Sequence, residues 1–233
     1  MANTPDQIVF FTWNFVTING TLVFSWIVMA ILLTVGLLAT RNLKTGRDIS
    51  RLQNGLEIIV RALRNEVKSL AGRESVTYVS FIGTIFLFIS LLNLFSPVPY
   101  YQPPTSSISV TAALAITVFV AVPVYGIAER GVGGYLRHYI EPSPVMLPFT
   151  LISELSRTLA LAIRLFGNIL SGTMIVGVLL SLAPLVIPLI MEVFGLLIGQ
   201  IQAYIFAALA AVYIGSAIRV QDRAQQNDNP EKE

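Results

Sequence analysis

The chain has 233 residues, of which 55% are hydrophobic and only 12% are charged, and its mean hydropathy is +0.73. Soluble domains carry about 25% charged residues, so this composition excludes an ordinary soluble protein and indicates a membrane protein. The net charge is only +2, and cysteine is absent, which excludes disulfide bonds and thiolate metal sites.

The first spanning helix is predicted over residues 20–40. Residues 7–40 contain no charge, and about 20 apolar residues are enough to cross the hydrocarbon core. The preceding N-terminus carries an acidic residue and no basic segment, so it does not read as a cleaved signal peptide.

Residues 41–74 form a charged segment that contains over half of all the lysines and arginines of the chain. The positive-inside rule therefore places this segment in the cytoplasm and the N-terminus outside. Within it, apolar residues recur at alternating steps of three and four, which predicts an amphipathic helix. They are Ile49, Leu52, Leu56, Ile59, Leu63, Val67 and Leu70. This helix could lie on the membrane surface or pack against a partner helix, and both alternatives stay open.

Two further spans are predicted within residues 76–128, which carry no charge. A stretch with four prolines, residues 96–109, separates them as an external loop. Residues 129–148 are charged again and are predicted to form a loop on the inside. That loop contains His138, the only histidine, which we expect to be solvated.

Residues 148–218 are predicted to form a long helical hairpin that turns at Pro184 and Pro188. Both helices exceed the length needed for a perpendicular crossing, so the hairpin should be inclined. Residues 219–233 form a polar tail, expected to be disordered and inside. The prediction is one membrane domain, all-α and polytopic, over residues 1–233. It has five spanning helices and one amphipathic surface helix.

Arg164 is the residue that points most directly to function. After Arg164 no charge occurs until Glu192, and after Glu192 none until Arg219. A charge at the bilayer centre costs about 2.5 to 3.5 kcal/mol on insertion scales, so an arginine there needs a counter-charge or a water-lined cavity. The alternative is that Arg164 extends its side chain to a helix end.

The helical spacing predicts which side chains share a face with Arg164. On the fifth predicted span they are Glu154, Arg157, Leu161, Arg164 and Asn168, with Ala160, Gly167 and Ser171 close to them. On the sixth span, one side of the helix is predicted to carry Glu192, Gly195, Gly199 and Gln202. Small residues allow another helix to approach closely.

Counting from the turn places Arg164 and Gln202 at similar depth, since they lie 20 residues before and 18 residues after Pro184. A cation and an amide deep in the membrane form a candidate site for an external carboxylate. The alternative is that Asn168 and Gln202 only form hydrogen bonds within the bundle.

Two motifs carry a resemblance to a known family. Residues 159–172 read LALAIRLFGNILSG, and residues 201–215 read IQAYIFAALAAVYIG. With them the chain resembles subunit a of the F-type rotary ATP synthase, whose signatures are Arg-Leu-Phe-Gly-Asn and Gln-Ala-x-x-Phe. Weaker matches lie at LQNGLE (52–57), around Asn93, and at PPTSSISVT (103–111).

The resemblance implies a stator subunit with two ion half-channels. These would load and unload the carboxylates of a c-subunit ring with H⁺ or Na⁺ during ATP synthesis. By this resemblance Arg164 is the essential arginine and Gln202 the glutamine that faces it. The subunit would hold no catalytic site and no cofactor. The small residues expected to face the ring are Ala160, Gly167, Ser171, Gly195 and Gly199.

The implied partners are the c ring, b-type peripheral stalk subunits, the rest of the synthase and the lipid bilayer, with no nucleic acid. The implied location is a bacterial plasma membrane, as a multi-pass protein with the C-terminus in the cytoplasm. A rival function from another class is a secondary transporter or channel that uses Arg164 as an anion site.

The sequence departs from the family where the outer half-channel is expected. Thr173 and Gly195 stand where many members have Glu or His, and Ser107 and Ser109 stand where the external loop usually has Asp and Asn. Glu192 is then the best remaining group to gather cations at the outer entrance, unless it only caps its helix. Glu154 is the corresponding candidate at the inner entrance, unless it pairs with Arg157.

Overall fold

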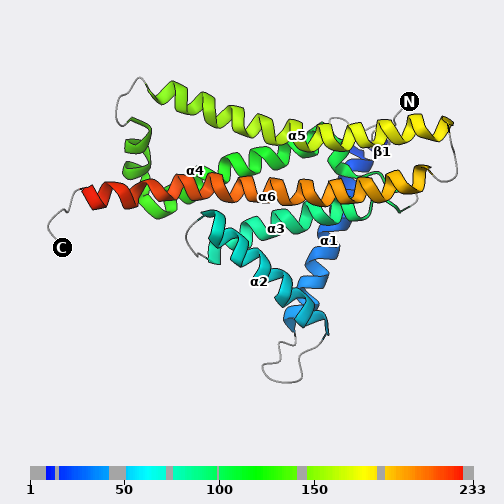
Figure 1. Ribbon diagram of the computed structural model, residues 1–233, viewed down its shortest axis with the longest axis horizontal. Coiled ribbons are helices and arrows are strands. Elements are labelled where there is room, and N and C mark those ends of the chain that lie inside the picture. Colours follow the sequence, from blue (N-terminus) through cyan, green and yellow to red (C-terminus); the bar gives the residue numbers. More distant parts are fainter. Residues whose placement is uncertain are drawn as a thin grey trace.

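The computed structural model describes residues 9–13, 16–41, 51–71, 76–98, 100–140, 146–182 and 187–227. Among these residues a short N-terminal hairpin is followed by six α-helices, which are drawn in Figure 1. The elements are β1 (Val9–Trp13), β2 (Val16–Asn19), α1 (Gly20–Arg41), α2 (Arg51–Ala71), α3 (Val76–Leu94), the 3₁₀ turn η2 (Pro104–Ser106), α4 (Ile108–Ile140), α5 (Met146–Leu182) and α6 (Ile187–Asn227).

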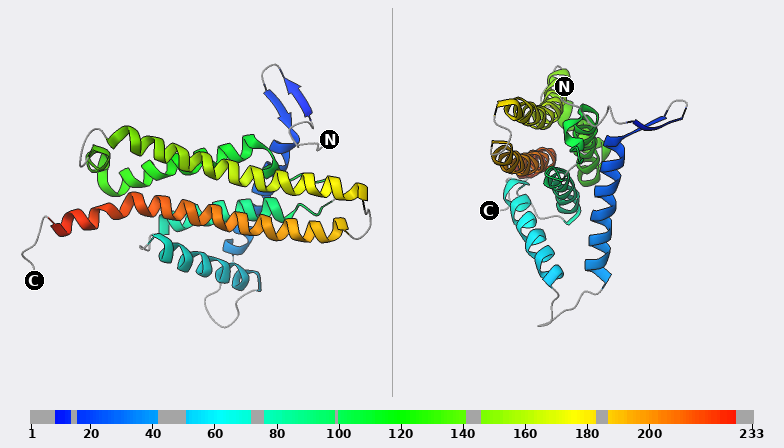
Figure 2. Two further views of the ribbon diagram at one scale, coloured as in Figure 1. Left: turned by 45° about the horizontal axis from the view of Figure 1, so that its top comes forward. Right: turned by 90° about the vertical axis from the view of Figure 1, so that its right-hand side faces the viewer.

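Helices α3 to α6 run side by side as a bundle, and α1 and α2 lie across it (Figures 1 and 2). The predicted helical polytopic fold and its C-terminal hairpin are confirmed. The antiparallel pair β1–β2, with Trp13 opposite Val16, was not predicted. It lies before α1 in the uncharged residues 7–40, for which the sequence predicted only the spanning helix.

Four helices are long and apolar enough to cross a membrane, among the residues that the structure describes. Their apolar windows are Gly20–Leu38, Ile108–Ala128, Ile152–Leu179 and Leu189–Ser216. The apolar part of α3, Tyr78–Leu94, is shorter. That α3 is a fifth span therefore stays a prediction.

Helix α6 is the centre of the packing. Its alanines, among them Ala203, Ala207 and Ala210, are at most 5% exposed and belong to two hydrophobic clusters. One cluster joins α6 to α2, α3 and α4, and the other joins it to α3, α4 and α5. Alanine allows the neighbouring helices to approach closely on several sides at once.

The amphipathic helix α2 packs against α3 and α6 of its own chain. Val67 is 2% exposed within the first cluster. Cδ1 of Leu63 lies 3.4 Å from the position that an added Cβ of Gly83 on α3 would occupy. The Tyr204 hydroxyl on α6 donates a hydrogen bond to Oε1 of Glu66. The sequence left two alternatives open for this helix, namely lying on the membrane surface or packing against a partner helix. The side of α2 that bears Val67 packs within the protein, whereas Ile58 is 60% exposed.

Two predicted boundaries were wrong. Helix α4 continues through residues 129–140, which had been predicted as a loop, and it changes direction at Gly131 (φ 73°, ψ 164°). Glycine adopts such a positive φ without steric cost, so one residue redirects the chain in place of a loop. Helix α6 likewise extends to Asn227, so the first part of the predicted disordered tail is helical. The side chain of His138 lies outside the described residues.

The predicted external loop is folded against the bundle. Thr105 and Ser107 are 0% and 1% exposed. The Tyr101 hydroxyl donates to the backbone oxygen of Leu92 at 2.9 Å, and its ring makes edge contacts with Phe24 and Phe95. Burial raises the pKa of Tyr101 above its usual value. This segment is therefore part of the packed structure.

Helices α3 and α6 approach closely at Gly199, which is buried. A Cβ atom added there would lie 2.9 Å from Cβ of Asn93, closer than real Cβ atoms approach. At Gly195, one turn earlier on the same helix, an added Cβ would meet nothing within 4 Å.

These two glycines give a matched pair for a stability test. Gly199→Ala should lower the melting temperature of the protein purified in detergent, because overpacking costs about 1–3 kcal/mol. Gly195→Ala should leave it unchanged or raise it, because alanine is favoured over glycine in helices by up to about 1 kcal/mol. Equal melting temperatures for the two variants would contradict the close contact with Asn93.

Candidate functional site

Arg164 lies in the middle of α5 and is exposed. The exposed residues within about one turn of it are uncharged: Leu159 and Ile163 are 58% and 56% exposed, and Ala160 and Asn168 are also exposed. Among the described residues no carboxylate forms an ion pair with Arg164; the ion pair Arg61–Glu57 lies on α2. The guanidinium charge is therefore presented outward from an uncharged part of the helix, with no counter-charge supplied by the described residues.

Gln202 is 1% exposed and faces α5. Nδ2 of Asn168 donates a hydrogen bond to its Oε1 at 2.6 Å, so the two amides are joined across the hairpin. The structure thus pairs Gln202 with Asn168, one helical turn beyond Arg164. Nε2 of Gln202 is buried and has no partner among the described residues. A buried donor without a partner is costly, so this atom is available for a further acceptor.

Three of the five small residues predicted to face a partner are exposed, namely Ala160, Ser171 and Gly195, and Gly167 is half-buried. A Cβ atom added at Gly167 or Gly195 would meet nothing within 4 Å. These four positions are open to an external surface. The prediction for Gly199 was wrong, because this residue faces α3 and is covered by Asn93. The helical drift along α6 carries it away from the exposed side.

Glu154 and Arg157 lie toward the other end of α5. The guanidinium carbon of Arg157 is 5.5 Å from the ring centroid of Tyr213 on α6, a cation–π distance. Arg157 therefore helps to hold the two helices of the hairpin together. Glu154 is half-buried, and its backbone oxygen accepts a hydrogen bond from the Thr158 hydroxyl at 3.0 Å.

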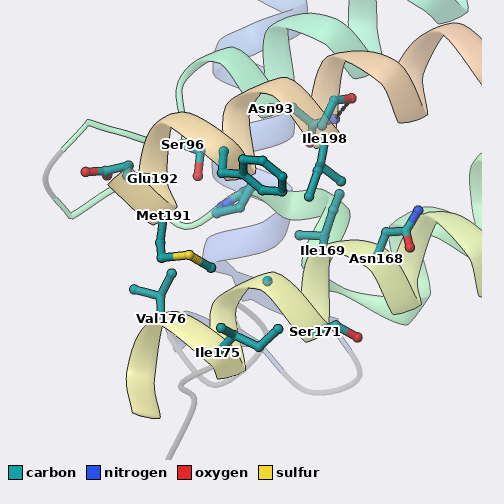
Figure 3. A pocket seen from close by; sticks show the side chains of 15 residues that line it. Asn93, Ser96, Asn168, Ile169, Ser171, Ile175, Val176, Met191, Glu192 and Ile198 are labelled. Atoms are coloured by element: carbon teal, nitrogen blue, oxygen red, sulfur yellow. Dashed lines mark hydrogen bonds between the residues drawn. The ribbon is translucent and has the colours of Figure 1, made fainter. Parts of the chain in front are cut away.

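A cavity of about 570 Å³ opens between the C-terminal half of α5 and the N-terminal half of α6. In Figure 3, Val176 points toward Met191 and Ile198 toward Ile169 across it. Its polar lining comes from three helices: Asn168 and Ser171 of α5, Glu192 of α6, and Asn93 and Ser96 at the end of α3. Glu192 is exposed, and Gly195 and Gly199 also line the cavity.

Sequence reasoning missed the contribution of α3 to this site. Asn93 is 4% exposed and was noticed only as a weak motif match. The available signal was a single asparagine in a helix with no charge, since a buried amide in such a helix needs specific partners. The side chain of Thr173 lies outside the described residues. Among the described residues, no group of acidic or histidine side chains could hold a metal ion.

Comparison with known proteins identifies the family of the chain. The profile of the family described as ATP synthase A chain matches residues 22–215. ATP synthase subunit a 2 of Acaryochloris marina is 51% identical over 98% of both chains, and ATP synthase subunit a 1 of Crocosphaera subtropica is 52% identical over 97% of this chain and 99% of its own. ATP synthase subunit a of Albidiferax ferrireducens is 51% identical over 94% and 95%. With a profile match over most of its length and relatives of this similarity, the chain belongs to the ATP synthase subunit a family.

Proposed function

We propose that this protein is the ion-translocating stator subunit of an F-type ATP synthase and that Arg164 acts on the carboxylates of a c-subunit ring. The observation that carries the proposal is the exposed guanidinium whose nearest exposed neighbours are uncharged, with no counter-charge among the described residues. In a membrane such a charge needs a counter-charge or a water-lined cavity, and a carboxylate of a neighbouring subunit would supply the counter-charge. Family membership argues against the rival secondary transporter.

The chemistry at Arg164 is electrostatic. A rotor carboxylate can face lipid only when H⁺ or Na⁺ neutralises it. Arginine keeps its proton, and two unit charges about 4 Å apart attract by about 4 kcal/mol at an effective dielectric near 20. That energy lowers the pKa of an arriving carboxyl by about three units, so it releases its ion. The fixed charge also repels a cation moving directly from one side to the other.

The cavity between α5 and α6 supports an outer half-channel. It joins Glu192 to Asn168, which binds Gln202 beside Arg164. The unpartnered Nε2 of Gln202 supplies a hydrogen-bond donor near the place where a carboxylate would load. Glu154 would draw cations toward an inner half-channel at the other end of α5.

The orientation, the partners and the ion follow from the same proposal. The ends of α3 and α5 and the starts of α4 and α6 lie toward one side of the bundle, which would face outward (Figure 1). The other side and the C-terminus would face the cytoplasm of a bacterium. The c ring covers the face that bears Arg164, and b-type subunits anchor the stator. The transported ion is H⁺ or Na⁺.

Arg164→Ala should abolish ATP-driven ion pumping while the complex still assembles, because carboxylates would pass the stator without losing their ions. Passive leak through the membrane sector should rise. Arg164→Lys should also fail, because an ammonium is a compact charge with a shiftable pKa. ATP-driven ion pumping into membrane vesicles is the measurement for both variants. Normal ion-coupled ATP synthesis by Arg164→Ala would contradict the proposal.

Glu154→Gln should slow ATP-driven pumping at low ion concentration on the cytoplasmic side, by roughly two- to tenfold, because a local carboxylate raises the cation concentration at the entrance. At high ion concentration the rate should recover. A rate that matches the wild type at every ion concentration would assign Glu154 a purely structural part.

Glu192→Gln should weaken ATP synthesis driven by ions from outside, again most strongly at low external ion concentration. ATP hydrolysis by the detached catalytic sector should not change, which provides the control. An unaltered dependence on external ion concentration would mean that Glu192 only caps α6 and that the outer path lies elsewhere.

A further inference from the structure

A small polar network connects α3 and η2 to one turn of α6. Nδ2 of Asn93 donates to the backbone oxygen of Gly199 at 3.0 Å, and the Thr105 hydroxyl donates to Oδ1 of Asn93 at 2.7 Å. Next to it, the Ser90 hydroxyl donates to Oε1 of Gln200, and Nε2 of Gln200 donates to the backbone oxygen of Ser90 at 2.9 Å. We call these five residues the α3–α6 joint.

The joint fixes α6 in both rotation and register. Asn93 and Thr105 are 4% and 0% exposed, so breaking their hydrogen bonds would leave polar groups buried without partners. Both ends of the Asn93 amide are engaged, which leaves it one orientation. The missing Cβ of Gly199 is what admits Asn93 to this position. Apolar packing alone would tolerate sliding of α6, whereas directional hydrogen bonds do not.

The joint lies within one turn of the functional amide. Gly199 and Gln200 bind α3, and Gln202 binds Asn168 of α5 at 2.6 Å. This segment of α6 is therefore held from two sides, by α3 and by α5. Any rotation of α6 that the joint prevents would move the Gln202 carboxamide away from Asn168.

We propose that Asn93 and Thr105 are positioning residues that hold α6 so that Gln202 stays opposite Asn168 while the rotor moves past Arg164. They act through Gly199 and need no contact with the ion. This inference rests on the proposed function for its effect on transport, but its geometric part can be tested separately.

Thr105→Val is the variant that tests the transport effect. Valine keeps the shape of threonine and removes the hydroxyl that orients Asn93, and Thr105 is not among the residues that line the cavity. The intact complex should assemble in normal amounts, with a maximal rate of ion-driven ATP synthesis about tenfold lower, since small misplacements at a reacting site can cost up to about 100-fold. The ion concentration at half-maximal rate should not change. Thr105→Ser keeps the hydroxyl and should restore the rate.

Thr111→Val is the matched control. Thr111 is also 0% exposed, but its hydroxyl bonds only to backbone oxygens of Ser107 and Ile108 beside its own helix. The maximal rate of ion-driven ATP synthesis by Thr111→Val should equal that of the wild type. Equal losses in Thr105→Val and Thr111→Val would overturn the inference, and so would a change in the half-maximal ion concentration, which would place Thr105 on the ion path.

Cross-linking tests the geometry without relying on transport. The chain has no cysteine, so Asn168→Cys with Gln202→Cys introduces a single pair of cysteines into this subunit of the assembled complex. Adding Thr105→Val should slow disulfide formation at least about threefold, and adding Thr111→Val should not. An unchanged rate with Thr105→Val would overturn the joint. If Thr105→Val slows disulfide formation in the cysteine pair, but Thr105→Val alone supports normal ATP synthesis, the joint is kept and the role of Gln202 in transport is overturned.

Discussion

The structure depends on one electrostatic constraint, an arginine exposed in the middle of a long and largely apolar helix. The described residues give Arg164 no anionic partner, and its exposed neighbours within about one turn are uncharged. Because an isolated charge is costly in hydrocarbon, this face needs a counter-charge or water beside it, and in the proposed function a partner subunit supplies the charge. The open small residues around Arg164 allow that partner to come close.

The remaining helices support the hairpin that carries this charge. Alanines along α6 let α2, α3, α4 and α5 pack around one helix, and the polar contacts occur where α6 passes the site. Asn168, Gln202 and Asn93 are the amides that connect three helices there. Hydrophobic burial thus determines which helices are neighbours, and hydrogen bonds between amides determine how they are rotated.

Much of this was predictable from the sequence, because the strongest signals are local. The uncharged runs predicted the helices, and the periodicity of residues 49–70 predicted α2. The spacing around Arg164 and Glu192 singled out Asn168, Ser171, Glu192 and Gly195, which line one cavity. The burial of Gly199 was not predictable from spacing, because it depends on α3, which is far away in sequence. The same holds for Asn93 and Thr105, whose partners lie on other elements. The direction of α4 depends on one positive φ at Gly131, which sequence periodicity does not report.

The length of the hairpin helices has a mechanical consequence. The apolar windows of α5 and α6 have 28 residues each, which at 1.5 Å per residue is about 42 Å. To fit a hydrocarbon core about 30 Å thick, each must lean by roughly 45° and travel about 30 Å sideways. That distance is about three helix diameters. In the proposed function, a stator of this width would contact several neighbouring rotor helices at once, and the ring would stay supported while a single carboxylate exchanges its ion.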